Sequence, residues 1–454
     1  MKLLFTLAAF ALALGLLIVF HELGHYWAAR LCGVKVLRFS IGFGKPLWKR
    51  RFIKDGTEWM LAAFPFGGYV KMVDEHEGEV APKDIPRAFN RQPVYRRFAI
   101  VLAGPVANFL LAILLYWVLF VHGVPGIKPI IGSVPPATPA AVAGFKAEET
   151  IVNINGEATA TWQDVRWLLL QHAVQKSLVN VEVRSPRGEI AWHKLDLSEL
   201  TVTDLDGDFM KVVGLSRYQP QVEPVIGQLV TGGPGERGGL KPDDEILAIN
   251  GERVTHWDDV VQKVRSHPSQ NLKFEIKRGK QRLNITLTPE TVQDNDEKIG
   301  RIGAAPKIDR TALQRLLTEE RYPIGPALSK SLKKTWETSV FSLKMLGKML
   351  VGEISWKNVS GPITIADYAG QSAQIGWEAY LSFLALISIS LGVLNMLPVP
   401  LLDGGHLMCY LVEIIKGKPV SEKALQIGQH VGIALLFILM AFAIYNDINR
   451  LITG

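Results

Sequence analysis

Five consecutive residues, His21-Glu22-Leu23-Gly24-His25, offer the clearest chemistry in this sequence. On a helix, residues four positions apart lie on the same face, so His21 and His25 can present two imidazole nitrogens to one metal ion. Glu22 lies beside them and can reach a water molecule on that metal. This H-E-x-x-H pattern is typical of zinc hydrolases, in which the glutamate is the general base. The alternative is that both histidines only make polar contacts at a helix end, but ionisable groups in an apolar span favour a functional site.

A long apolar run precedes these residues and must position them. It extends from Leu3 to Phe20, and at about 1.5 Å per residue the stretch from Leu3 to His21 covers about 27 Å, close to the thickness of the hydrocarbon core of a bilayer. The run is long for a signal peptide and has no A-x-A-like cleavage site before the histidines. The sequence therefore predicts a first membrane helix over residues 1–32, with the zinc motif toward its far end.

The stretch NMLPVPLLDGGH, residues 395–406, is a second candidate site motif. Pro398 and Pro400 must break or distort a helix there. Broken backbone at membrane depth is tolerated only where it lines a cavity in the protein. Asp403 follows the break directly and is a candidate third metal ligand, with His406 as the alternative. Three protein ligands leave zinc one open position for water.

Composition and hydropathy indicate a membrane protein with soluble parts. The 454 residues are 48% hydrophobic, and further apolar runs predict membrane helices over residues 98–121, 377–410 and 424–447. The net charge of +7 is scattered, so we interpret it as loop charge and not as a nucleic-acid surface. The predicted fold class is a polytopic α-helical membrane protein with four transmembrane helices. In the second of these helices, Gly104 and Asn108 suggest close packing against a neighbouring helix.

Basic residues indicate how the chain is oriented. They crowd residues 30–97 and recur at Lys416, Lys418 and Lys423, and the positive-inside rule places both stretches in the cytoplasm. Residues 122–376 and both termini then lie on the opposite side of the membrane. The metal motif lies toward the cytoplasmic face.

Residues 33–97 favour strands followed by a surface helix. The segment VKVLRFSIGFG alternates in polarity, and EWMLAAFPFGGYVKM is apolar, aromatic and rich in glycine. The two segments form either a small cytoplasmic sheet or a membrane-associated β-hairpin that dips toward the metal. In the second case, a sheet edge can pair with an unfolded substrate segment. Periodicity alone leaves both possibilities open.

An internal repeat organises the part of the chain between the second and third spans. AGFKAEETIVNINGEATATWQDV begins at Ala143 and GGLKPDDEILAINGERVTHWDDV begins at Gly238, so matched residues are 95 positions apart (238 − 143 = 95). A period of this length indicates two tandem α+β domains, which we place at residues 126–220 and 221–305. In each copy, Asn-Gly is the expected turn between two strands.

Both copies resemble a PDZ domain, a family that binds extended peptides by adding a strand to a sheet edge. That family usually has Gly-Asp before the isoleucine of the pattern, where this chain has Glu148-Glu149 and Asp243-Asp244. A plain spacer is the alternative for both copies. After them, residues 321–376 predict a linker with an amphipathic helix around Trp336–Leu350, which either lies on the membrane surface or packs on a domain.

HELGH within an apolar span, a distant N-x-x-P-x-P-x-x-D-G and a PDZ-like pair between them together resemble the site-2 protease family of intramembrane zinc metalloproteases. The resemblance covers nearly the whole chain. It implies that one Zn²⁺ is bound by His21, His25 and Asp403 and that Glu22 is the catalytic base. It also implies that the second motif and a membrane-embedded hairpin near the site bind substrate. The corresponding residues here are Asn395, Pro398 and Pro400 in the motif and Phe66, Gly67 and Gly68 in the hairpin.

The same resemblance implies a biological setting. Its bacterial members are multi-pass proteins of the inner membrane, with periplasmic PDZ-like domains and an active site toward the cytoplasm. Their substrates are single-span membrane proteins, namely an anti-sigma factor already trimmed by a first protease and remnant signal peptides. For this chain we expect an intramembrane zinc endopeptidase, with such proteins and the lipid bilayer as partners and no nucleic acid. A membrane-tethered scaffold and a metal-dependent transporter are the competing classes, and four spans without an inverted repeat weigh against the transporter.

Overall fold

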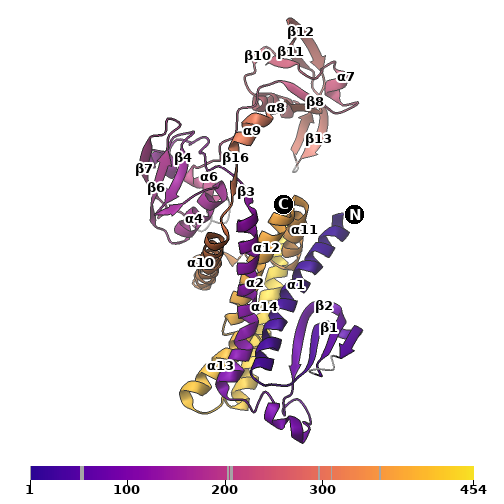
Figure 1. Ribbon diagram of the computed structural model, residues 1–454. Helices are drawn as coiled ribbons and strands as arrows, with labels where there is room; N and C mark the ends of the chain where they lie inside the picture. Colours follow the sequence, from indigo (N-terminus) through magenta and orange to yellow (C-terminus); the bar gives the residue numbers. More distant parts are fainter. Residues whose placement is uncertain are drawn as a thin grey trace. The chain divides into compact units, whose positions relative to one another are not determined.

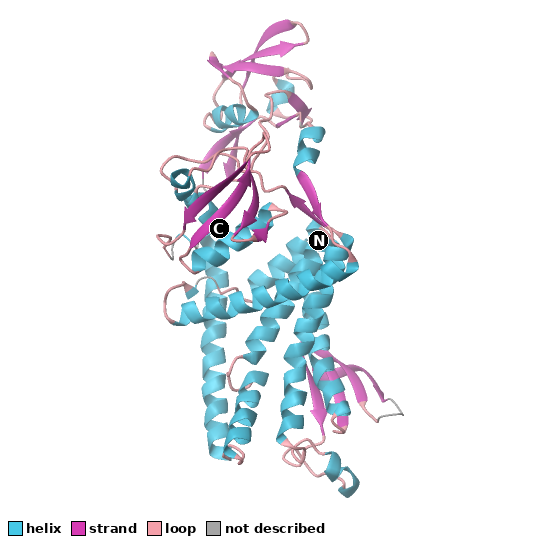
Figure 2. Ribbon diagram, turned by 60° about the vertical axis from the view of Figure 1, so that its left-hand side comes forward, coloured by secondary structure: helices cyan, strands magenta, loops and turns pink. Residues whose placement is uncertain are grey.

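The structure is a computed structural model that describes residues 2–51, 56–201, 204, 208–294, 297–307, 309–356 and 359–453. The chain forms two compact units. The first consists of residues 1–124, 201–207 and 319–453, and the second of residues 125–200 and 208–318. Every residue of the two candidate site motifs belongs to the first unit, which is mainly helical, whereas the second contains most of the strands (Figure 2).

Long helices build the first unit. Among the described residues, four helices are long and apolar enough to cross a membrane, over Leu3–Leu31, Val94–His122, Trp377–Met396 and Lys423–Arg450. They belong to α1 (Lys2–Leu31), α2 (Val94–His122), α12 (Trp377–Met396) and α14 (Glu422–Thr453). This finding confirms the prediction of four candidate membrane helices. Figure 1 shows α1, α2 and α12 running side by side, and these three helices contact one another.

Shorter elements complete this unit. They are β1 (Val36–Arg51), β2 (Glu58–Met72), the 3-10 helix η1 (Pro82–Arg87), α10 (Ile324–Leu350), α11 (Pro362–Ile375) and α13 (Asp403–Lys416). The expected third span, 377–410, is divided, because α12 ends at Met396 and α13 begins only at Asp403, with two prolines between them. The expected linker, 321–376, contains two helices, α10 and α11.

α2 packs against both α1 and α12 in the middle of the bundle. Buried apolar side chains from the three helices form one core, with Leu17, Leu119 and Ile389 among its members. α1 and α2 approach each other closely at Gly24, where a Cβ atom would collide with the carbonyl group of Ala103. The glycine inside the HELGH motif is therefore explained by helix packing.

β1 and β2 form an antiparallel hairpin. Both strands are bent, so the first part of β1 pairs with two different parts of β2. Residues 38–41 of β1 pair with residues 68–71 of β2 on one side and with residues 58–61 on the other. Within the described part of the chain, the register therefore gives residues 68–72 a strand partner on one side only. β2 also packs on α1, next to the half of α1 that carries the zinc motif (Figure 1).

Two four-stranded sheets with the same strand order form most of the second unit. The first has the order β5-β4-β6-β7 and the second has the order β10-β9-β11-β12. The first sheet and its helix comprise β4 (Thr150–Ile154), β5 (Glu157–Ala158), α4 (Trp162–Val174), β6 (Leu178–Arg184) and β7 (Ile190–Asp196). Their counterparts are β9 (Glu245–Ile249), β10 (Glu252–Arg253), α8 (Trp257–Arg265), β11 (Leu272–Arg278) and β12 (Gln281–Leu287).

Connecting and flanking segments account for the remaining elements. They are β3 (Val124–Ile127), α3 (Pro139–Ala143), α6 (Phe209–Val213), β8 (Ile226–Leu229), α7 (Pro234–Arg237), β13 (Glu290–Asp294), β14 (Glu297–Arg301), β15 (Ala304–Pro306), α9 (Arg310–Leu316) and β16 (Leu317–Glu320). β15 pairs with β8, and β13 pairs with β14.

A turn with the same backbone conformation precedes β4 in the first sheet and β9 in the second. The sequence alone did not determine its geometry. Glu148 and Asp243 both have left-handed backbone, with φ of 69° and 70°. This conformation disfavours residues that have a Cβ atom, so glycine adopts it most readily. The carboxylate of the next residue stabilises each turn: Glu149 accepts from the main chain of Lys146 at 2.9 Å, and in the second copy Asp244 accepts the equivalent bond at 2.8 Å.

Candidate active site

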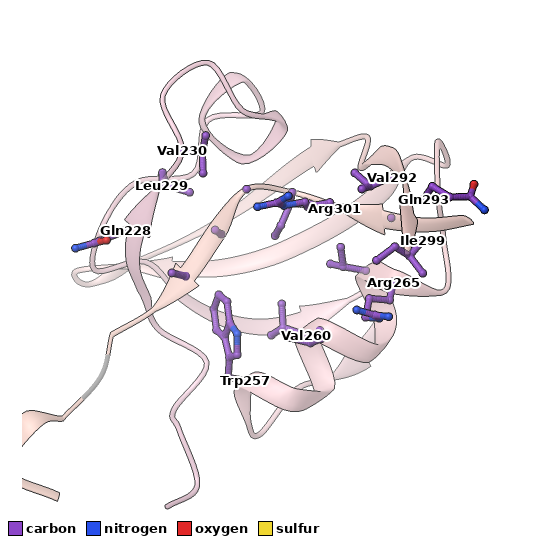
Figure 3. Close-up of a pocket in the computed structure, with 17 residues that line it drawn as sticks. Gln228, Leu229, Val230, Trp257, Val260, Arg265, Val292, Gln293, Ile299 and Arg301 are labelled. Carbon is purple, nitrogen blue, oxygen red and sulfur yellow. The ribbon is translucent and has the colours of Figure 1, made fainter. Parts of the chain in front are cut away.

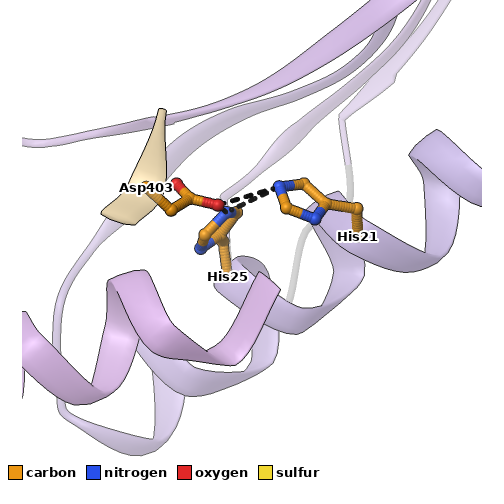
Figure 4. Close-up of side chains that lie close together, drawn as sticks. All are labelled: His21, His25 and Asp403. Atoms are coloured by element: carbon orange, nitrogen blue, oxygen red, sulfur yellow. Dashed lines mark hydrogen bonds and ion pairs between the residues drawn. The ribbon is translucent and has the colours of Figure 1, made fainter. Parts of the chain in front are cut away.

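Three side chains from the two motifs converge at one point (Figure 4). His21 and His25 lie one turn apart on α1, and Asp403 is the first residue of α13. Asp403 Oδ2 lies 3.1 Å from His21 Nε2 and 3.5 Å from His25 Nε2. The two Nε2 atoms lie 3.2 Å apart. Among the described residues, the side chains of His21, His25 and Asp403 form a group that could hold a metal ion.

The separations of the donor atoms fit a tetrahedral zinc ion. Zinc–nitrogen and zinc–oxygen bonds of about 2.0–2.2 Å at tetrahedral angles place neighbouring ligand atoms about 3.3–3.6 Å apart, and the three separations lie close to that range. Asp403 Oδ2 is buried and has no hydrogen-bond donor within the described residues. Lone pairs that face one another at this distance repel unless a cation lies between them. The residues present therefore fit the metal that the motif implies.

Helix α2 holds the outer nitrogen of each imidazole ring. His25 Nδ1 lies 2.9 Å from the carbonyl oxygen of Ile100, which can only accept, so Nδ1 carries the proton and Nε2 is free to bind metal. His21 Nδ1 lies 3.2 Å from Nδ2 of the Asn108 side-chain amide. The Oδ1 atom of the same amide is buried without a hydrogen-bond partner among the described residues, so the amide turned over by 180° would satisfy both Oδ1 and a protonated His21 Nδ1. A metal on His21 Nε2 requires the proton on Nδ1, and the amide oxygen of Asn108 is then the atom that accepts it.

Asn108 and Gly104 are site residues that the sequence analysis interpreted only as packing residues. Asn108 is fully buried, and Ser388 of α12 donates a hydrogen bond to its main-chain carbonyl at 2.7 Å. Gly104 lies one turn earlier, and a Cβ atom there would collide with the rings of both histidines. Their spacing of four residues within an apolar span was a signal that both face the same neighbour.

Asn108→Leu is expected to weaken zinc binding about 10- to 100-fold, because leucine is similar in size but cannot orient the His21 ring. Competition with a chromogenic chelator in detergent measures the affinity. Ser388→Ala is the matched control, since it removes a bond to the main chain of Asn108 and leaves the partner of the ring in place. Equal affinity in Asn108→Leu and the intact protein would contradict this role.

Glu22 and the three candidate ligands line a cavity of about 340 Å³. Gly68 of β2 and Asn395 near the end of α12 line it as well. Gly68 lies directly against Glu22, because a Cβ atom on this glycine would lie 2.9 Å from Glu22 Cγ. The structure thus brings two of the predicted substrate-binding residues to the predicted catalytic base.

Three other predicted substrate-binding residues do not line this cavity. Pro398 is exposed in the break between α12 and α13. Pro400 packs against α14, where a Cβ atom on Gly432 would collide with its carbonyl oxygen. Gly67 lies against the ring of Phe43.

Two further predicted residues need separate mention. Phe66 belongs to β2, but its side chain lies outside the described part of the structure. His406, the alternative to Asp403, is exposed on α13 and does not belong to the group of candidate ligands. The geometry therefore favours Asp403 as the third ligand.

A separate cavity of about 550 Å³ lies in the second unit (Figure 3). Its walls come from α8, β8 and the segment that contains β14 and β15, with Trp257, Val260 and Ile299 among the lining residues. None of its described lining residues is a histidine, a cysteine or a carboxylate, although Arg265 and Arg301 are among them. The described lining therefore offers no side chain that suits metal binding.

The fold and the site define a class of protein: one with four helices long and apolar enough to span a membrane and an H-E-x-x-H motif whose histidines, together with Asp403, could hold a metal ion. Residues 9–439 match peptidase family M50. The chain therefore belongs to peptidase family M50, which confirms the prediction of a zinc metalloprotease, a hydrolase of peptide bonds.

Similar proteins support this membership along the whole chain. A putative zinc metalloprotease of Neisseria meningitidis is 42% identical over 449 residues, covering 98% of this chain and 99% of that protein. The regulator of sigma-E protease of Escherichia coli is 40% identical over 448 residues, covering 99% of each. A crystal structure of a PDZ domain from Listeria innocua covers 20% of this chain and 98% of its own, with 18% identity and a TM-score of 0.17, too low to assign a fold.

Proposed function

We propose that this chain is an intramembrane zinc endopeptidase that cuts the transmembrane segments of single-span membrane proteins. One observation carries the proposal: two imidazole nitrogens from the apolar helix α1 and one carboxylate oxygen from α13 form a half-buried set, with a second carboxylate in the same cavity. That set is typical of a hydrolytic site, because three ligands leave zinc one open position.

Each side chain has a defined part in this chemistry. His21, His25 and Asp403 hold one zinc ion, which when bound supplies Lewis-acid activation of water and of the scissile carbonyl group. Glu22 accepts the proton that the attacking water loses and passes it to the leaving amine. Asn108 and the carbonyl of Ile100 keep the imidazole protons on the outer nitrogens, so that both Nε2 atoms face the metal.

Substrate is proposed to bind as an extended strand along residues 68–72 of β2. A helical substrate hides its carbonyl groups in hydrogen bonds and must unwind before hydrolysis. Among the described residues, 68–72 have a strand partner on one side only, and Gly68 and Tyr69 line the cavity. A substrate strand added there satisfies its own backbone groups and passes Glu22. Asn395, which also lines the cavity, offers a side-chain amide to the same backbone.

The β1–β2 hairpin is proposed to dip into the membrane. Large apolar side chains around its bend are exposed, including Phe43, Leu47, Trp48 and Phe64. A group of this size on a soluble surface is unfavourable, whereas lipid would cover it. The basic residues that flank the hairpin support a cytoplasmic position for its base and for the metal site.

The remaining features of the setting are proposed from the relatives. We propose a location in the bacterial inner membrane, with the second unit as two PDZ-like domains in the periplasm. Several of these relatives carry the name "regulator of sigma-E protease". We propose that the substrates are an anti-sigma factor already trimmed by a first protease and remnant signal peptides.

A cleavage assay on a labelled transmembrane peptide tests the proposed function. The purified protein in detergent is expected to cut the peptide when loaded with one zinc per chain and to stop when a chelator removes the metal. A membrane-tethered scaffold with a structural metal would bind zinc but leave the peptide intact. A stoichiometric zinc content without any cleavage would therefore overturn the proposal.

The second unit is proposed to limit the size of the substrate. It is inserted in the chain after α2 and before α10, so both of its ends join the membrane-spanning unit. Deleting residues 126–304 is expected to leave zinc binding and peptide cleavage intact. The shortened protein should also cut substrates that still carry a folded periplasmic domain, which the intact protein rejects. If it rejects them too, the limit lies elsewhere, and the helix α10 is the next element to test.

A further inference from the structure

An ion pair at the far end of α13 has no part in the chemistry described above. Arg97, in the first turn of α2, donates from Nη2 to Glu413 Oε1 of α13 at 2.6 Å. The guanidinium carbon of Arg97 also lies 5.0 Å from the centre of the Tyr410 ring. Each charged side chain is only 17% exposed. A charge-assisted pair that is shielded in this way constrains geometry more than an exposed pair does.

The orientation of α13 must be fixed by contacts of this kind, because α13 does not continue directly from α12. The connection over residues 397–402 contains two prolines, and Leu401 has left-handed backbone with φ of 84°. The main-chain hydrogen bonds across this break are short turn bonds, such as the one from Leu402 to the carbonyl of Val399, and not the i→i−4 bonds that continue an α-helix. The rotation of α13, and with it the direction of the Asp403 side chain, depends on tertiary contacts, and α2 is the element against which α13 mainly packs.

The positions of these residues connect the ion pair to the metal site. Tyr410 follows Asp403 by seven residues, so the two lie on the same face of α13 about two turns apart. On α2, Arg97 lies one turn before Ile100, whose carbonyl holds the His25 ring. A single turn of α2 therefore holds one ligand histidine of α1 and also the helix that carries the third ligand.

We propose that Arg97 is a positioning residue for the metal site: through Glu413 and Tyr410 it fixes the rotation of α13 and so directs Asp403 toward the two histidines. Arg97 contacts none of the ligand atoms and does not line the cavity. The inference rests on the proposed function only in taking His21, His25 and Asp403 as the zinc ligands.

Zinc affinity is the first measurement. Arg97→Gln and Glu413→Gln are each expected to raise the dissociation constant for zinc about tenfold, the lower end of what losing a supporting residue usually does. The reversed pair, R97E/E413R, is expected to return the affinity to within about threefold of the intact protein, because the pair is restored with opposite polarity. Arg91→Gln is the matched control, since it breaks an exposed ion pair with Glu75 in the same part of the chain.

Kinetics separate positioning from general damage. Arg97→Gln at saturating zinc is expected to lower kcat about tenfold and to leave KM for a transmembrane peptide within about twofold, because the cavity walls that contact substrate are unchanged. Arg97→Lys keeps the charge without the planar group that stacks on Tyr410, so an intermediate affinity for zinc is expected. Lysine thus provides a folded variant if glutamine at this position does not accumulate.

The metal-free protein provides a readout that does not depend on catalysis. Cys32 and Cys409 are the two cysteines of the chain, and both are free thiols, one just after α1 and one on α13. Spin labels on these cysteines report the distance between the two elements. Arg97→Gln is expected to broaden the distance distribution, and the reversed pair to narrow it again.

The outcomes separate this inference from the proposed function. Unchanged zinc affinity and an unchanged distance distribution in Arg97→Gln would overturn the positioning role while leaving the endopeptidase intact. Failure of the reversed pair to restore affinity, after both single variants lose it, would also overturn the role. If the intact protein itself binds no zinc, the proposed function fails, and the spin-label comparison still decides whether Arg97 fixes α13.

Discussion

Glu22→Gln is expected to keep zinc bound and to lower peptide cleavage by at least about 10²- to 10⁴-fold, the usual contribution of a general base. The three candidate ligand atoms come from other residues, so the metal site should persist. Glutamine is similar in size but cannot accept the proton from water. Cleavage of a labelled transmembrane peptide in detergent, measured together with zinc content, checks both parts of the expectation.

A glutamate outside the cavity serves as the control for this substitution. Glu77→Gln changes a carboxylate whose side chain is 61% exposed and should leave turnover unaltered. Turnover close to that of the intact protein in Glu22→Gln would remove Glu22 from the mechanism. Loss of zinc in the same variant would instead show that Glu22 acts on the metal site itself.

Asp403→Ala is expected to lose both zinc and activity. Two histidines alone form a weak site, and losing a ligand also leaves the two Nε2 atoms facing each other at 3.2 Å without a bridging group. Zinc content after gel filtration and the residual rate of peptide cleavage measure the two effects. The rate should fall to the level of the chelator-treated protein.

His406→Ala is the matched comparison, because His406 lies one turn further along the same helix but is exposed and outside the ligand group. It should retain zinc and activity. The opposite pattern, with zinc retained in Asp403→Ala and lost in His406→Ala, would reassign the third ligand. The contrast between the two variants therefore decides which residue of the second motif binds metal.

Because α2 packs closely around the candidate ligands, it is as important for the geometry of the metal site as α1 and α13, which carry those ligands. Gly104 leaves room for both histidine rings, Ile100 and Asn108 hold their outer nitrogens, and Ser388 ties Asn108 to α12. Ligand geometry in such a site depends on partners that do not touch the metal. Substitutions on α2 should therefore change zinc affinity even though α2 contributes no ligand.

Local patterns in the sequence determined the chemistry and the class of this protein. The spacing of His21 and His25 places them on one helix face whatever the rest of the chain does, because helical periodicity is a local property. The apolar runs determined the four candidate spans, since length and hydropathy suffice for that prediction. The two prolines before Asp403 determined that the helix must break there.

Tertiary structure alone decided how distant residues meet. The sequence offered Asp403 and His406 as third ligands, and only the packing of α13 on α2 selects the one that faces the histidines. The pairing of residues 68–71 with 38–41 brings Gly68 against Glu22, whereas the packing of Pro400 on α14 moves another predicted substrate-binding residue out of the cavity. These contacts depend on side chains far apart in the chain, and no local periodicity encodes them.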